Sequence, residues 1–262
     1  MAPFRDPPAE TFEAIANFRD LGGHQTTTGR RLRRGVLFRS GHLGRATDDD
    51  VAELQRLGIR RVFDFRTQAD IAADGADRLP NGTQHVQLPM PDPAAGEDIR
   101  TLIAKNATDG LEEIFGNGRA EKLMTRGAAH IVRHRPEPYT RFMHGLCEAD
   151  ALPALFHCSA GKDRAGWAAS VVLLAVDVPD DEVIEQYLLS NLAAERLRQN
   201  LTERDARTWG GVLQPLLEVR PEYIEASFEA MRERWGDFDS YLRDGLGVSE
   251  AQRDQLRAKL LE

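Results

Sequence analysis

The order of apolar and polar positions in the first quarter of the chain predicts a strand, a helix and a second strand. Residues 36–39 have the composition of a short strand. Thr47 and the acidic residues after it are typical of a helix start, and apolar residues then recur at helical spacing over residues 51–57. Gly58 ends this helix, and residues 59–65 form the second strand. This order begins an α/β layout.

The pattern after residue 138 predicts a further strand between helices. Residues 139–148 have a helical pattern, and residues 152–156 form a short apolar strand. Residues 163–176 are nearly all apolar, which is typical of a buried central helix. Later helices are expected over residues 180–201, from Pro221, and from Ser249, where a capping box begins.

Between these halves lies a long segment without a clear sheet pattern. Residues 75–98 are rich in proline, glycine and aspartate and are expected to be an irregular connection. Residues 99–135 carry weak helical patterns interrupted by glycines. We therefore predict one domain over residues 1–262, with residues 99–135 as a helical insertion. This insertion is either a lid over a site or a solvent-facing helical subdomain.

Composition limits the classes of function. The 262 residues are 41% hydrophobic, which is enough for a sizeable core. The net charge of −8 disfavours binding to nucleic acid or to a membrane surface, since both require a basic face. No run of about 18 apolar residues predicts a membrane span, so stable membrane insertion is not expected. Residues 1–10 lack the apolar run of a signal peptide. A cytoplasmic protein is expected, and export without a recognisable signal stays open.

The two cysteines, Cys147 and Cys158, are too few for a disulfide framework. No spacing of cysteine and histidine suggests zinc, so neither a metal nor another cofactor is predicted. Cys147 lies in a helical pattern and is expected to be a small core residue.

Cys158 and Arg164 are separated by five residues, and this spacing predicts an anion-binding loop. The preceding strand would deliver Cys158 into a loop that ends at the start of a helix. Backbone N–H groups of Ser159, Ala160, Gly161 and Lys162 can then point at one phosphate-sized centre, which the helix N-terminus also favours. Gly161 permits a close backbone approach. Arg164 offers a planar fork that matches two phosphate oxygens.

The same loop would activate Cys158 as a nucleophile. A cysteine at a helix N-terminus beside arginine and lysine is stabilised as a thiolate. It could attack phosphorus and form a cysteinyl-phosphate, which water then hydrolyses. Backbone donors would stabilise the transferring group, so this mechanism needs no metal. The alternative is an inert buried cysteine near a surface arginine.

Four segments carry a resemblance to a known family. Residues 157–164 read His-Cys-Ser-Ala-Gly-Lys-Asp-Arg, and matching motifs lie at residues 17–23, 38–40 and 64–67. Over residues 11–195 the chain resembles the bacterial tyrosine-protein phosphatases whose loop reads H-C-x-x-G-K-D-R. The resemblance implies a doubly wound α/β fold, with a central, mostly parallel sheet flanked by helices and a helical lid.

The resemblance also implies activity on phosphotyrosine. Some members of the family act on phosphoserine, phosphothreonine and phosphoinositides as well, so a phosphorylated protein or a phosphoinositide is the expected partner. The oligomeric state stays open. One position departs from the family pattern: Ala165 stands where a threonine or serine usually donates a hydrogen bond to the thiolate. We therefore expect slower hydrolysis of the phosphoenzyme.

Two carboxyl groups are candidates for the general acid that protonates the leaving group. Asp163 lies inside the loop, where the family carries an aspartate tied to catalysis. Asp64 lies at a predicted strand end, where sites of α/β proteins gather. Each has a structural alternative. Asp163 could order the helix start, and Asp64 could pair with Arg66 or Arg164.

Several further residues are predicted to support the site. Arg39 and Arg66 are candidates for binding substrate charge, as is Arg19, although a structural ion pair is an equal alternative for each. Lys162 would add positive charge over the phosphate. His157 is expected to orient the loop by hydrogen bonding, since a thiolate needs no base. Asn191 either supports the loop or lies on an ordinary helix surface.

Two other functions fit part of the pattern. A catalytically weak phosphate-binding module would keep Arg164 but turn over poorly because of Ala165. A sulfur-transfer enzyme also places a cysteine on a loop before a helix. The Lys162-Asp163-Arg164 run argues against sulfur transfer, because those loops are usually shorter.

Overall fold

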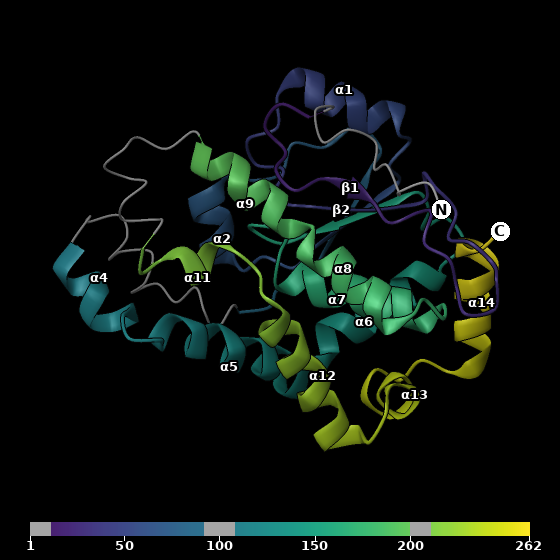
Figure 1. Cartoon of the computed structure of the whole chain (residues 1–262). Coiled ribbons are helices and arrows are strands. Elements are labelled where there is room, and N and C mark those ends of the chain that lie inside the picture. The colour runs from purple at the N-terminus through teal and green to yellow at the C-terminus, as the bar shows by residue number, and fades with distance from the viewer. Residues whose placement is uncertain (1–11, 92–107, 200–210) are drawn as a thin grey trace.

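The computed structural model describes residues 12–91, 108–199 and 211–262 (Figure 1). Its centre is a five-stranded sheet with the strand order β1-β2-β5-β3-β4. Only the short β1 pairs antiparallel, with β2, and the other pairs are parallel. The mostly parallel α/β sheet expected from the sequence is therefore confirmed. The strands are β1 (Arg19–Asp20), β2 (Leu37–Ser40), β3 (Arg61–Asp64), β4 (Gln84–Gln87) and β5 (Ala154–His157).

Successive residues of the inner strands enter two different cores, one on each face of the sheet. On one face, Phe38, Val62 and Leu155 pack with Leu54 of α1 (Asp48–Arg56). On the other face, the alternate strand residues join the main core, which also includes α6 (Pro136–Cys147) and α7 (Arg164–Ala175). Figure 1 shows α1 on one side of the sheet, with α6 and α7 on the other. Helices on both faces make the sheet doubly wound.

The helix start signals of the sequence coincide with helix starts in the structure. Thr47, Thr67 and Ser249 each form a capping box at the start of α1, α2 (Gln68–Asp74) and α14 (Glu250–Leu260). All twelve residues of α7 are buried, as its apolar sequence predicts. The other C-terminal helices are α11 (Gln214–Leu217), α12 (Pro221–Trp235), α13 (Phe238–Ser240) and the π-helix η1 (Tyr241–Gly245).

Two expected segments differ from the structure. Residues 75–98 were expected to be irregular throughout, but residues 84–87 form β4, the edge strand beside β3. Three of the four β4 residues are exposed, so the strand lacks the apolar pattern by which strands are recognised. The helix expected over residues 180–201 is divided into α8 (Asp180–Leu188) and α9 (Ser190–Gln199). Residues 200–201 lie outside the described part of the chain.

Helices α4 (Thr108–Phe115) and α5 (Arg119–His134) occupy the described part of the predicted insertion, and residues 99–107 lie outside it. Met124, Ile131 and Val132 of α5 belong to the main core. Helix α5 packs along α12, as Figure 1 also shows. Across the described residues, no helix is both long enough and apolar enough to cross a membrane.

The parallel register places the ends of four strands in one row. Ser40 pairs with His157, His157 with Asp64, and Asp64 with Gln87. Each is the last residue of its strand, so the loops that follow β2, β3, β4 and β5 leave the same edge of the sheet. Ligand sites of open α/β sheets form at this edge.

Candidate active site

The loop between β5 and α7 carries the predicted nucleophile. Cys158 follows directly on β5 and is 2% exposed, and Arg164 is the first residue of α7. Gly161 has φ +71°, and a Cβ atom there would lie 2.3 Å from the backbone oxygen of Ser40. Glycine is therefore required both by the backbone conformation and by the close contact between the loop and the end of β2.

Arg39 holds this loop by hydrogen bonds to its backbone carbonyl oxygens. It is fully buried, and its Nη2 donates to the carbonyl oxygens of Gly161 at 2.8 Å and Lys162 at 3.2 Å. Its Nη1 donates to Gln186 Oε1 at 2.9 Å. Burial lowers the pKa of Arg39 to about 10, although the nearby Cys158 opposes this shift. The guanidinium thus contacts loop carbonyls, and its role in binding substrate charge stays a prediction.

Asn17 and Arg19 hold the loop from another side. Asn17 Nδ2 donates to the carbonyl oxygens of Ala160 at 3.2 Å and Gly161 at 3.1 Å. Arg19 Nη1 donates to Asn17 Oδ1, and its Nη2 donates to Ser190 Oγ at 3.0 Å. Asn17 was not predicted as a site residue, although it begins the first of the four matching motifs. Arg19 therefore acts on the loop through its hydrogen bond to Asn17.

A carboxylate that the sequence analysis missed holds Arg164. Arg164 Nη1 donates to Asp70 Oδ2 at 2.8 Å and to the carbonyl oxygen of Met90 at 3.0 Å. Its Nη2 lies 3.4 Å from Ser159 Oγ, on the side of the loop. Asp70 is itself fixed by the capping box with Thr67, and that Thr-x-x-Asp pattern was the available signal. The Asp70 contact orients the guanidinium beside the loop.

Lys162 and Asp163 form an ion pair at 2.8 Å within the loop. Lys162 Nζ also lies 3.5 Å from the carbonyl oxygen of Glu218. Asn191 holds the neighbouring residue, Val219, by two backbone hydrogen bonds of 2.8 and 2.9 Å. Asn191 therefore acts on the segment that contacts Lys162, and its hydrogen bonds to the described residues go to Val219. The Asp163 side chain is 16% exposed, and Lys162 is turned toward it.

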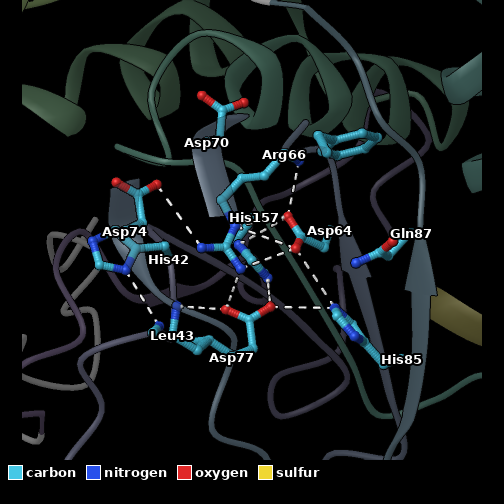
Figure 2. A network of polar contacts seen from close by, with 12 residues as sticks. His42, Leu43, Asp64, Arg66, Asp70, Asp74, Asp77, His85, Gln87 and His157 are labelled. Atoms are coloured by element: carbon cyan, nitrogen blue, oxygen red, sulfur yellow. Dashed lines mark hydrogen bonds and ion pairs between the residues drawn. The ribbon is translucent and has the colours of Figure 1, made fainter. Parts of the chain in front are cut away.

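Asp64 lies in a buried ion pair. Arg66 Nη2 donates to Asp64 Oδ2 at 3.0 Å and to Asp77 Oδ1 at 2.7 Å, and neither Asp64 nor the Arg66 side chain is exposed (Figure 2). Burial acts to raise the pKa of Asp64, but hydrogen bonding to His85 and the charges of His157 and Arg66 outweigh burial and lower it. Arg66 is thus engaged by carboxylates, which is the ion-pair alternative to its predicted substrate contact.

His157 links this buried network to the nucleophile. Its Nδ1 lies 3.2 Å from the carbonyl oxygen of Cys158, and its Nε2 lies 3.0 Å from Asp77 Oδ2. His85 Nε2 approaches the same Asp77 oxygen at 3.2 Å (Figure 2). Hydrogen bonding to Asp64 and Asp77 raises the pKa of His85 to about 9. Neither Asp77 nor His85 was predicted as a site residue. Both lie in residues 75–98, which were expected to be irregular and contain no recognisable motif.

The geometry brings most of the predicted residues into one place. The loop, Arg164 and the carboxyl end of the sheet form a site in which a buried cysteine lies at the N-terminus of a helix. Ala165 is fully buried in the first turn of α7 and offers no hydroxyl there. Such a site can bind an anion and present a sulfur nucleophile to it.

Three known proteins similar to this chain are named as phosphatases. A Cupriavidus necator protein named as a tyrosine-protein phosphatase is 35% identical over 92% of this chain and 85% of its own. The triple specificity protein phosphatase PtpB of Mycobacterium tuberculosis is 32% identical over 94% of this chain and 96% of its own. A Nostoc commune tyrosine-protein phosphatase is 27% identical over 86% of this chain and 74% of its own.

The solved structure of Pseudomonas aeruginosa TpbA aligns with 77% of this chain and 89% of its own, at 16% identity and a TM-score of 0.31. The sequence profile of the tyrosine phosphatase family matches residues 10–262, nearly the whole chain. The resemblance found from four short motifs is thereby confirmed, and the chain belongs to the tyrosine phosphatase family.

Proposed function

We propose that this enzyme hydrolyses phosphate monoesters through a cysteinyl-phosphate intermediate at Cys158. The observation that carries the proposal is the position of Cys158. Its backbone enters a loop that leads into α7, and Arg164 lies at the other end of that loop. Asp70 orients Arg164 from one side, and Arg39 braces the loop from behind.

Positive charge lies close to Cys158. The N-terminus of α7 carries partial positive charge, and the buried guanidinium of Arg39 adds a full charge close by. Both are fixed in place before substrate binds, so little reorganisation is needed when charge develops. The loop N–H groups and Arg164 would then hold the phosphate.

The reaction proceeds in two displacements. In the first, the thiolate of Cys158 attacks phosphorus, an S–P bond forms, and the P–O bond to the leaving group breaks. The leaving oxygen takes up a proton from a general acid. In the second, water attacks phosphorus and gives a proton to the carboxylate that acted as the acid, the S–P bond breaks, and phosphate leaves as the thiolate is restored.

We assign the general acid to Asp163. Asp64 is enclosed, ionised and paired with Arg66, and an ionised carboxylate has no proton to give. Asp163 is also paired, with Lys162, but it lies in the loop itself and its side chain is partly exposed, so it can exchange a proton with water. Lys162 would have two roles. Its positive charge would attract the phosphate, and its ion pair would hold the Asp163 side chain in position.

Phosphotyrosine is the proposed substrate, with phosphoserine, phosphothreonine and phosphoinositides as further candidates. The name of the mycobacterial relative, a triple specificity phosphatase, supports the wider range. We also retain the proposal of a single domain with a helical lid at residues 99–135. Within this range the structure describes α4 and α5. The faces of these two helices that lie outside the core would belong to the lid.

A substrate panel tests the proposal. Purified protein is assayed with phosphotyrosine, phosphoserine and phosphothreonine peptides and with phosphoinositides, beside Cys158→Ser and Cys147→Ser variants. We expect release of phosphate by the parent and by Cys147→Ser, and none by Cys158→Ser. Equal release by Cys158→Ser would exclude the cysteine mechanism.

A further inference from the structure

Four side chains with metal-binding atoms converge directly beneath the candidate active site. Asp64 ends β3, Asp77 lies between α2 and β4, His85 lies on β4, and His157 ends β5 (Figure 2). One ligand atom from each lies within 4.8 Å of all the others. The four residues are distant in sequence, so no motif could reveal the cluster.

Hydrogen bonding within the cluster is incomplete. The carbonyl oxygen of Cys158 can only accept, so His157 Nδ1 carries the proton that it donates there. In a neutral imidazole the other nitrogen, Nε2, then presents a lone pair. It lies 3.0 Å from Asp77 Oδ2, also an electron-pair donor. Both atoms are buried, and their 3.0 Å approach lacks hydrogen-bond geometry, although His85 Nε2 also lies 3.2 Å from Asp77 Oδ2. Two such atoms at this distance require a cation, which is either a proton on His157 Nε2 or a metal ion.

The other atoms of these side chains are held as in a metal site. Asp77 Oδ1 accepts from Arg66 Nη2 at 2.7 Å and from the backbone N–H of Leu43 at 3.0 Å. Asp64 Oδ1 accepts from the backbone N–H of Arg66 at 2.8 Å. The second oxygen of Asp77 therefore faces the histidines. The second oxygen of Asp64 lies 3.6 Å from His85 Nε2 and also accepts from Arg66 Nη2 at 3.0 Å. Metal-bound histidines commonly donate their other N–H to a backbone carbonyl, as His157 does, and bound carboxylates accept similar supporting bonds.

We propose that Asp64, Asp77, His85 and His157 bind a divalent transition metal ion of the zinc class. Zinc bonds of about 2.0–2.2 Å in a tetrahedron place neighbouring ligand atoms about 3.3–3.6 Å apart. The observed separations are 3.0 Å for His157–Asp77, 3.2 Å for His85–Asp77 and 3.6 Å for His85–Asp64. Two imidazoles among the ligands disfavour magnesium and calcium, which prefer all-oxygen sites.

The charges and the access route are compatible with this metal. Arg66 opposes a cation, but it balances only one of the two carboxylates, so one net negative charge is available to a metal ion that displaces the proton of His85. The His85 side chain is 30% exposed at the edge of the sheet, and this gives a path for entry. A metal on His157 Nε2 would fix the proton on Nδ1. It would thereby hold the Cys158 carbonyl at the start of the loop.

Metal binding by the full chain carrying Cys158→Ser tests this, since that variant removes the catalytic thiolate as a competing ligand. Bound zinc is measured by mass spectrometry after equilibrium dialysis, and cobalt is used as a spectroscopic probe. We expect one metal ion per chain and tetrahedral cobalt bands without sulfur-to-cobalt charge transfer. His85→Gln or Asp77→Asn, added to the Cys158→Ser chain, should weaken zinc binding at least about tenfold.

His144→Gln in the same Cys158→Ser chain is the matched control, because His144 contacts the carbonyl oxygen of Gly247, away from the cluster. It should bind zinc as tightly as Cys158→Ser alone. His85 lies on an exposed edge strand, so His85→Gln decides the test even if Asp77→Asn fails to fold. If the Cys158→Ser chain binds no metal, the cation between His157 and Asp77 is a proton and the proposal is overturned. The proposal is also overturned if a folded His85→Gln variant binds zinc as tightly as Cys158→Ser alone.

Discussion

At the scale of single residues, the five-residue spacing of Cys158 and Arg164 encodes a loop of fixed length that ends at a helix start. This loop between β5 and α7 could be predicted from the sequence, but the side chains that hold it could not. Arg39 and Arg66 were expected either to bind substrate charge or to form structural ion pairs, and their guanidinium groups contact loop carbonyls and buried carboxylates. A sequence does not show which way an arginine points.

Asp163→Asn and Asp64→Asn are expected to change the pH dependence of kcat/KM differently, because kcat/KM reports the first displacement. A general acid must be protonated, so kcat/KM falls as pH rises through its apparent pKa. Asp163→Asn should lower kcat/KM about 10²–10⁴-fold and flatten this alkaline fall. Asp64→Asn should retain the fall. The measurement is kcat/KM against pH with a phosphotyrosine peptide, and an alkaline fall lost only in Asp64→Asn would reverse the assignment.

Ala165→Ser should speed the second chemical step. A serine hydroxyl in the first turn of α7 could donate to the Cys158 sulfur and ease its departure from phosphorus. A hydrogen bond to a charged group contributes roughly 1.5–3 kcal/mol, so hydrolysis of the phosphoenzyme should be about tenfold faster or more. Rapid-quench measurement of the decay of the phosphoenzyme gives the rate.

Ala168→Ser, one turn further along the same buried helix, is the control and should leave that rate unchanged. An unchanged rate in Ala165→Ser would show that the missing hydroxyl does not limit turnover. A slow second step in the parent would also explain why a weak phosphate-binding module fits part of the sequence.

At the scale of elements, the loop depends on neighbours that are remote in sequence. Helix α9 contributes Asn191, whose amide bonds the backbone of Val219, and the adjoining Glu218 carbonyl lies beside Lys162. The end of β2 meets Gly161, and the N-terminal segment contributes Asn17. The site is therefore assembled from four separate segments around one loop.

Asn191→Ala tests the contact between α9 and the segment that follows it. Loss of two hydrogen bonds should lower the free energy of unfolding by about 1–3 kcal/mol. The same change should lower kcat/KM, because the Glu218 carbonyl would lose its position beside Lys162. Denaturant unfolding and steady-state kinetics provide the two measurements.

Leu192→Ala, at the next position and 63% exposed, is the matched control. It should change neither quantity by a measurable amount. Equal effects of the two substitutions would show that the Asn191 amide has no special role.

At the scale of the whole molecule, the inner strands and the helix starts could be predicted, because each has a local signal. The strands predicted over residues 59–65 and 152–156 correspond to β3 and β5, and Ser249 begins a capping box. Strand β4 could not be predicted, since a polar edge strand is defined by its partner and not by its own residues. The Asp77–His85 contact was missed for the same reason.

The C-terminal helix is tied to the central helix by charge. Arg253 Nη2 and Arg257 Nε both donate to Asp177, which follows α7 with φ +66°. Asp177→Asn keeps a residue that tolerates this conformation and removes the charge. It should lower the free energy of unfolding by about 1 kcal/mol, and less at high salt. Asp244→Asn, in an exposed pair with Arg243, is the control and should not shift the Tm.

The central claim is that Cys158 becomes phosphorylated during turnover. The direct measurement is rapid acid quench of enzyme mixed with excess phosphotyrosine peptide, followed by mass spectrometry of the peptide that contains Cys158. We predict one phosphoryl group per chain on Cys158, formed in a burst before steady turnover and absent in Cys158→Ser. Steady release of phosphate with Cys158 unmodified at every quench time would contradict the account.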